Sequence, residues 1–220
     1  MINTLQKQLR KIYGLSHIQH VSQFLINFET LKNTMQQDEL DPNIREKVVL
    51  RINPDDSVEL GLYIKKDSLH NLRINEPDLA LGEHNLADFC SVIEGVSHVQ
   101  FLLHRSKLAL ELSALEMEVQ AEIDKFITSF IYRYSREGST HCAQELQEIL
   151  FQNFHLNPQL KPEEKDRYQL ASHAAAKLCR HLRREFIKGK PKWAELLSFL
   201  RQFYRQSWRA KHATISTAAT

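Results

Sequence analysis

Glu94 and His98, in the stretch LADFCSVIEGVSHVQF, place a carboxylate and an imidazole four residues apart. Side chains at this spacing share one face of a helix, where both can ligate a metal ion or the carboxylate can orient the imidazole. The next helical stretch offers a second pair at the same spacing, Glu118 and Glu122. If the two helices pack antiparallel, the pairs would face each other, as in the carboxylate-rich metal sites of helical bundles. These four residues are therefore a candidate metal site.

A structural role accounts for the same residues more simply. Cys90, Glu94 and His98 form a row beside the apolar face of their helix. The sequence also lacks the two Glu-x-x-His motifs that di-metal bundles use. Gly95 interrupts the row, and because glycine costs about 1 kcal/mol in a helix interior, it suggests the close approach of another helix. We therefore keep the metal site as the alternative interpretation, and the leading interpretation needs no cofactor.

The spacing of the glycines excludes several classes of enzyme. The six glycines are never closer than 13 residues. A loop that cradles phosphate needs clustered glycines so that backbone N–H groups can approach the anion, so the sequence contains no Walker, Rossmann or kinase-type loop. The sequence GVSH, which contains Ser97, lacks the second glycine of a nucleophile elbow and lies within a helical pattern. No residue is assigned a catalytic role, and the sequence favours a non-catalytic protein.

Charge is divided unevenly along the chain. Residues 161–220 contain 14 Lys and Arg against 5 Asp and Glu, and residues 1–160 contain 15 against 22, although the net charge of the whole chain is only +2. A basic segment of this kind is typical of contact with an anionic partner, either an acidic protein face or nucleic acid. Alternatively, the basic end docks on the acidic body of the same chain. The residues predicted to contact the anionic partner are Arg180, Arg183, Arg184, Lys188, Arg201, Arg205, Trp208 and Arg209.

Hydrophobic periodicity predicts a mainly α protein, a multi-helix bundle with one small β-hairpin packed on it. A Ser-x-x-Glu capping box, from Ser113 to Glu116, marks the start of one long helix. The predicted helices cover approximately residues 3–12, 16–31, 85–103, 113–137, 140–154, 163–188 and 191–211.

The β-hairpin is predicted at about residues 47–65, where apolar and polar residues alternate around a Pro-Asp-Asp-Ser turn. A two-stranded hairpin alone is marginally stable in water, so we expect it to pack on a helix or to gain a third strand, for which residues 71–75 are a candidate. Gly61, in the second strand, indicates a bulge or a close neighbour.

The stretch HLNPQLKPEEK, with its two prolines and a shift in composition after it, is the predicted linker. We expect an acidic helical body with the hairpin at residues 1–157, a basic C-terminal helical pair at 158–212 and a disordered tail at 213–220.

The cysteines indicate the compartment. Cys90, Cys142 and Cys179 form no CxxC pair, which favours a reducing environment. The N-terminal stretch is amphipathic, and no window has the roughly 18 uninterrupted apolar residues of a membrane-spanning helix. The sequence thus predicts a cytoplasmic binding or adaptor protein of a larger assembly, without a membrane span, whose basic C-terminal helices contact an anionic partner.

Overall fold

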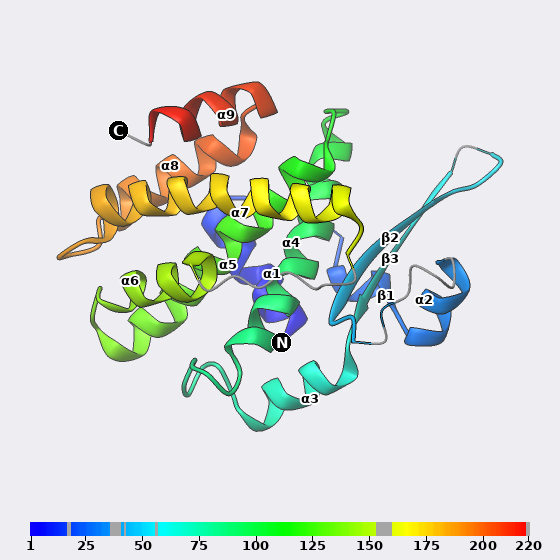
Figure 1. The fold of residues 1–220 in the computed structure, drawn as a ribbon, viewed down its shortest axis with the longest axis horizontal. Coiled ribbons are helices and arrows are strands. Elements are labelled where there is room, and N and C mark those ends of the chain that lie inside the picture. The colour runs from blue at the N-terminus through cyan, green and yellow to red at the C-terminus, as the bar shows by residue number, and fades with distance from the viewer. Residues whose placement is uncertain (17–18, 36–40, 42, 56, 153–159, 219–220) are drawn as a thin grey trace.

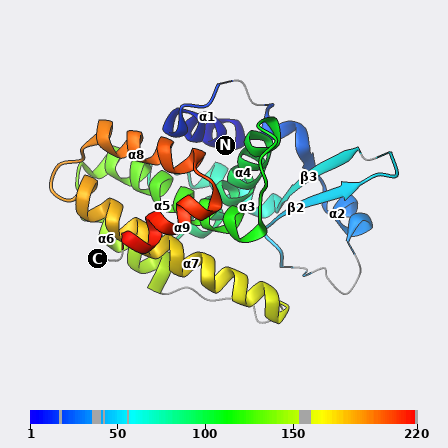
Figure 2. The ribbon, with the colours of Figure 1, turned by 90° about the horizontal axis from the view of Figure 1, so that it is seen from above.

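The computed structural model describes the chain except for residues 17–18, 36–40, 42, 56, 153–159 and 219–220. Within the described residues the protein has nine α-helices and one small three-stranded mixed sheet. The helices gather into one layered body, and the sheet projects from one end of it (Figures 1 and 2). The predicted fold class, a mainly α bundle with a β-hairpin packed on it, is confirmed.

The elements follow one another along the chain with short connections. In chain order they are α1 (Ile2–Tyr13), a 3₁₀ turn (Val21–Phe24), β1 (Leu25–Ile26), α2 (Phe28–Thr34), β2 (Glu46–Ile52), β3 (Val58–Ile64), α3 (Lys66–Ile74), α4 (Leu86–Lys107), α5 (Ala114–Glu137), α6 (Cys142–Gln147), a π-helical segment (Glu148–Gln152), α7 (Pro162–Leu182), a second π-helical segment (Arg183–Ile187), α8 (Trp193–Arg205) and α9 (Trp208–Thr217).

The predicted hairpin is present as β2 and β3, paired antiparallel with Glu46 opposite Ile64. Its third strand is β1, which pairs parallel to β3, and not residues 71–75, most of which lie in α3. A Cβ added to Gly61 would lie 2.9 Å from Cγ2 of Val49 and 3.0 Å from Cδ1 of Ile26. Gly61 therefore marks a close neighbour, because the side chains of both adjacent strands fill the space beside it.

The helix predicted at residues 16–31 is wrong. The described part of this stretch forms the 3₁₀ turn, strand β1 and the start of α2. Two side chains explain the irregular path. Gln6 of α1 accepts a hydrogen bond from the backbone N–H of Val21 and donates one to the carbonyl of Gln19. Asn27 caps α2 by accepting from the backbone N–H of Thr30 at 2.8 Å. The apolar spacing was compatible with a helix, but these tertiary and capping hydrogen bonds favour the other path.

The helices α4 and α5 form the centre of the body and run antiparallel, joined by a short loop. Their contacts pair early residues of one with late residues of the other, as in the ion pairs Glu94–Lys125 and Arg105–Glu116. The helix α1 packs on α4, and α7 packs along α5 (Figure 1). The antiparallel arrangement on which the candidate metal site depends is confirmed.

By length and composition, α4 is the described helix that could cross a membrane. However, 61% of its apolar stretch is buried inside the protein, against α1, α5 and the sheet. The core helix of a globular protein has the same properties, so the absence of a membrane span stays a prediction.

The C-terminal segment differs from the sequence prediction in two places. The helix predicted at 191–211 breaks at Gln206, whose backbone is extended, and Ser207 then caps α9 by accepting from the backbone N–H of Ala210. The tail predicted to be disordered from residue 213 is instead helical as far as Thr217. Ile215 explains this difference, since its side chain is buried in the core, where it stabilises the last helix.

Candidate metal centre

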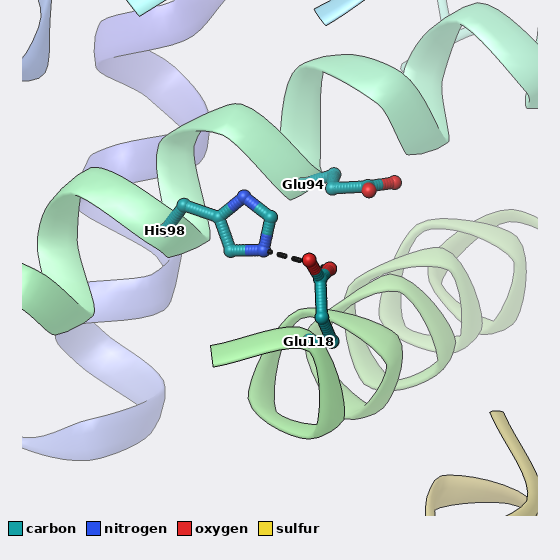
Figure 3. Close-up of side chains that lie close together, drawn as sticks. All are labelled: Glu94, His98 and Glu118. Atoms are coloured by element: carbon teal, nitrogen blue, oxygen red, sulfur yellow. Dashed lines mark ion pairs between the residues drawn. The ribbon is translucent and has the colours of Figure 1, made fainter. Parts of the chain in front are cut away.

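Three of the four predicted metal ligands meet where α4 crosses α5 (Figure 3). Glu94 and His98 project from α4, and Glu118 projects from the facing turn of α5. One ligand atom from each lies within 4.8 Å of the other two. The Nε2 atom of His98 is 3.3 Å from Oε2 of Glu118, and the exposed fractions of these two side chains are 5% and 9%. The three ligand atoms thus lie between two helices, where His98 and Glu118 are largely closed to solvent.

Glu122, the fourth predicted ligand, has a different partner. Its Oε1 accepts a hydrogen bond at 2.7 Å from Nζ of Lys125, which also donates to Oε2 of Glu94 at 3.1 Å. Lys125 is itself buried. The ammonium group of Lys125 therefore joins two carboxylates, and Glu122 lies beside the group of three ligand atoms without belonging to it.

Glu46, a residue that the sequence analysis did not single out, reaches the site from β2. Its Oε2 lies 4.0 Å from Nδ1 of His98, on the opposite side of the imidazole from Glu118. A Cβ at Gly95 would lie 3.1 Å from this Oε2 and 2.7 Å from Cδ1 of Leu62. The close approach predicted at Gly95 is therefore real, but the neighbour is the sheet and not another helix.

The site is rich in negative charge. Four buried or half-buried glutamates, Glu46, Glu94, Glu118 and Glu122, face Lys125, Arg167 and, when it is protonated, His98. Arg167 comes from α7, and its Nε lies 3.6 Å from Oε1 of Glu118. An excess of carboxylates in a buried pocket favours the binding of a cation or of protons.

The pKa values show where protons are held. Burial, with the charge of Glu94, raises the pKa of Glu46 to about 8. Burial disfavours a charged imidazole, but the Glu118, Glu46 and Glu94 carboxylates outweigh it and raise the pKa of His98 to about 9. Burial also disfavours a charged Glu94, but the Lys125 ammonium and the neighbouring His98 together outweigh burial there and lower the pKa. At neutral pH the site thus favours a proton on His98, which a divalent cation can displace when it binds the imidazole.

Two neighbouring residues do not contribute to this site. Cys90 is buried, and burial raises the pKa of its thiol to about 12, so the sulfur stays protonated. Ser97 donates its hydroxyl hydrogen to Oδ2 of Asp124 at 2.6 Å, on another side of α4. The row of Cys90, Glu94 and His98 is therefore largely buried, and Glu94 and His98 are its members that reach the cluster.

The predicted anion-binding residues divide into two groups. Arg201 donates to the backbone carbonyls of Lys11 and Ile12, and Arg205 donates to that of Gly14. Both arginines thereby stabilise the C-terminal end of α1, beside which α8 lies (Figure 2).

The other predicted anion-binding residues lie in α7, in or just after the second π-helical segment, and in α9. Arg183 donates to Oε1 of Gln147 at 2.9 Å, and Arg184 pairs with Glu185 at 2.6 Å. Trp208 is half-buried. The side chains of Arg180, Arg184, Lys188 and Arg209 are exposed. Part of the basic end thus binds the body of the same chain, which was the alternative to contact with an anionic partner.

Comparison of the chain with protein-family models, with curated proteins and with solved structures gave no match.

Proposed function

We propose that this chain is a metal-binding helical protein in which Glu94, His98 and Glu118 hold one divalent cation. The observation that carries the proposal is the meeting of three ligand atoms within 4.8 Å of one another, on two largely buried side chains and one half-buried side chain between two helices. Among the described residues, the buried Nε2 of His98 has no partner with hydrogen-bond geometry, only the ion pair with Glu118. An imidazole nitrogen aimed at a carboxylate in this way is poised to share a metal ion with it.

The spacing of the atoms supports a first-row transition metal. Two ligands that each lie about 2.1 Å from one tetrahedral metal are separated by roughly 3.4 Å, close to the 3.3 Å between Nε2 of His98 and Oε2 of Glu118. Glu94 would turn from Lys125 toward these atoms, and Lys125 would keep Glu122 as its partner. One imidazole with two carboxylates suits Zn²⁺, Fe²⁺ or Mn²⁺.

Metal titration tests this proposal. We expect one equivalent of Zn²⁺ or Mn²⁺ to bind to the purified chain in isothermal titration calorimetry. Replacing a ligand with an amide side chain should weaken binding by about 100-fold or more, since loss of a partner in the outer shell alone costs about 10- to 100-fold. The variants are His98→Gln and Glu118→Gln.

Glu122→Gln is the matched control, because Glu122 lies one helical turn from Glu118 and is equally buried. Because it removes one negative charge beside the site but no ligand, it should weaken metal binding by less than about tenfold, well short of the loss in either ligand variant. Failure of the unaltered chain to bind stoichiometric metal, or an equal loss in Glu122→Gln, would contradict the proposed ligand set.

Contact with an anionic partner is a second candidate function, favoured by the exposure of Arg180, Arg184, Lys188 and Arg209 on the basic segment. These side chains can neutralise phosphates or carboxylates of a partner without disturbing the hydrogen bonds of Arg201 and Arg205 to α1. Nucleic acid is the partner class that we would test first, because its binding has a characteristic dependence on salt.

Fluorescence anisotropy with labelled single-stranded RNA and DNA checks this second function. We expect the logarithm of the affinity to fall linearly with the logarithm of salt concentration, and the combined variant Arg180→Gln, Lys188→Gln, Arg209→Gln to reduce that slope by about one per lost phosphate contact. The control is Lys32→Gln, Lys66→Gln, Arg73→Gln, which removes three exposed cations from the body. Equal effects of the two triple variants, or no binding at low salt, would speak against this function.

A further inference from the structure

Glu46 lies at the first position of β2, where the sheet meets α4. The exposed fraction of its side chain is only 11%. Among the described residues its Oε2 has no hydrogen-bond partner, although it is buried. It lies above Gly95, in space that any other residue at that position would occupy, since an added Cβ would approach Oε2 to 3.1 Å. A buried carboxyl oxygen without a hydrogen-bond partner calls for a functional explanation.

The two nitrogens of His98 face different carboxylates. Nε2 points to Glu118 at 3.3 Å, and Nδ1 points to Glu46 at 4.0 Å. In metal sites a histidine commonly donates the N–H of its free nitrogen to a carboxylate, which fixes the tautomer and orients the ring.

We propose that Glu46 is the positioning residue of the metal centre: it accepts the Nδ1 hydrogen of His98 and so leaves the Nε2 lone pair for the metal. This inference rests on the proposed metal-binding function and adds to it a role for the β-hairpin. The distance of 4.0 Å would shorten to a hydrogen bond when the metal binds.

The residues on either side of Glu46 anchor the strand to the helical body. Arg45 pairs with Asp88 of α4 at 3.4 Å, and Lys47 pairs with Glu164 of α7 at 3.8 Å. The start of β2 is thus held between two helices while the far end of the hairpin projects from the body (Figure 2). Beneath Glu46, the buried Leu62 contacts the face of α4 at Gly95. These contacts fix the backbone from which Glu46 reaches His98.

The proposed hydrogen bond between His98 and Glu46 has a consequence for the sheet. A metal held by His98 would add a hydrogen bond between α4 and the start of β2, beside the half-exposed ion pair of Arg45 with Asp88. We expect Zn²⁺ to slow amide hydrogen exchange in residues 46–49 and to leave exchange at the exposed strand ends, 52 and 58, unchanged.

Calorimetry and NMR on the intact chain with Zn²⁺ test the role of Glu46. Glu46→Gln should weaken Zn²⁺ binding about 10- to 100-fold, the usual effect of altering an outer-shell partner. Long-range ¹H–¹⁵N spectra should show the Nδ1–H tautomer of His98 in the Zn²⁺ form of both the unaltered chain and Glu46→Gln, because an amide oxygen still accepts that hydrogen. In Glu46→Ala no side-chain oxygen accepts that hydrogen, so the Nδ1–H of His98 should exchange faster with solvent and the slowed exchange in residues 46–49 should be lost.

Two further variants separate a positioning role from a structural one. Gly95→Ala keeps Glu46 but adds a Cβ 2.7 Å from Cδ1 of Leu62 and 3.1 Å from Oε2 of Glu46, so it should crowd both side chains and also weaken Zn²⁺ binding. Glu59→Gln, which alters an exposed acid of β3, should not. Melting of the metal-free variants shows whether each is folded. Zn²⁺ binding that is unchanged in Glu46→Gln and Glu46→Ala would overturn the role of Glu46 and leave the metal centre standing, whereas no Zn²⁺ binding by the unaltered chain would remove both.

Discussion

Replacing Lys125 with methionine is expected to lower the free energy of unfolding by about 3–5 kcal/mol at pH 8, the usual cost of removing one partner from a buried ion pair. Lys125 is buried and joins Glu94 to Glu122 at 3.1 and 2.7 Å. Methionine fills the same space but leaves two neighbouring carboxylates without their cation. Each of these two carboxylates must then remain charged in a buried position or take up a proton.

The pH dependence of this loss of stability follows from the direction in which the pKa values of Glu94 and Glu122 are shifted. Burial already raises the pKa of Glu122, and Lys125 holds that of Glu94 low. Without Lys125, the pKa of both carboxyl groups in the folded state should lie above the value in the unfolded chain. The penalty is therefore largest above the folded pKa and disappears as the pH falls toward the unfolded value, about 4.3. The deficit should shrink steadily from pH 8 to pH 5.

Urea unfolding followed by circular dichroism measures this deficit at pH 8, 6.5 and 5. Lys65→Met is the control, because its ion pair with Asp67 is long, at 3.9 Å, and Asp67 is 86% exposed. That variant should stay within about 0.5 kcal/mol of the unaltered chain. The metal proposal adds a second readout, since a pocket that has lost one cation should bind Zn²⁺ more tightly. A deficit of equal size at pH 5 and pH 8 would show that lost packing, not charge, destabilises the variant.

The candidate site shows what helical spacing can predict. An interval of four residues placed Glu94 and His98 on one face of α4, and the short loop after α4 implied the antiparallel partner that brings Glu118 opposite them. Spacing alone did not distinguish Glu118 from Glu122, because both fit the same stripe of α5. The rotation of α5 and the place of Lys125 decide which carboxylate faces the imidazole, and both depend on packing across the whole interface.

Local sequence patterns could not predict that Glu46 lies beside His98. It lies 52 residues before His98, and nothing in the alternation of β2 indicates on which helix the strand will rest. Gly95 was the available signal, since a glycine inside a helix indicates a close neighbour, but it does not identify that neighbour. The misassigned helix at residues 16–31 has a similar cause: Gln6 holds the backbone near Val21 through hydrogen bonds that apolar periodicity cannot reveal.

One of the two hydrogen bonds of the capping box predicted at Ser113 is confirmed. The residue that should make the other, Glu116, belongs to a second buried cluster of charged side chains. Ser113 accepts a hydrogen bond from the backbone N–H of Glu116 at 3.1 Å, as predicted. The Glu116 side chain, however, lies within 3.2 Å of Arg105 and 3.1 Å of Lys211. Nζ of Lys211 also lies 4.2 Å from the ring centroid of Phe101. One fully buried carboxylate thus holds two buried cations, one of them from α9.

Glu116→Leu is accordingly expected to cost about 3–5 kcal/mol at pH 7, because it leaves Arg105 and Lys211 as unpaired buried charges. Lys211→Met is the matched change, since Glu116 keeps Arg105 and the methionine can pack on Phe101, so its cost should stay below about 1 kcal/mol. Burial, partly offset by Glu116, lowers the pKa of Lys211 to about 8.

The pH dependence distinguishes charge from packing in Glu116→Leu. A folded-state pKa below the unfolded value of about 10.4 means that the cost of burying the ammonium is full below the folded pKa and is lost as the pH rises toward the unfolded one. Without Glu116 the folded pKa should fall further, so the deficit measured by urea unfolding should be clearly smaller at pH 9.5 than at pH 7. Equal deficits at the two pH values, or a Lys211→Met variant as unstable as Glu116→Leu, would mean that the contacts of α9, and not the balance of charge around Glu116, hold the C-terminal helix on the body.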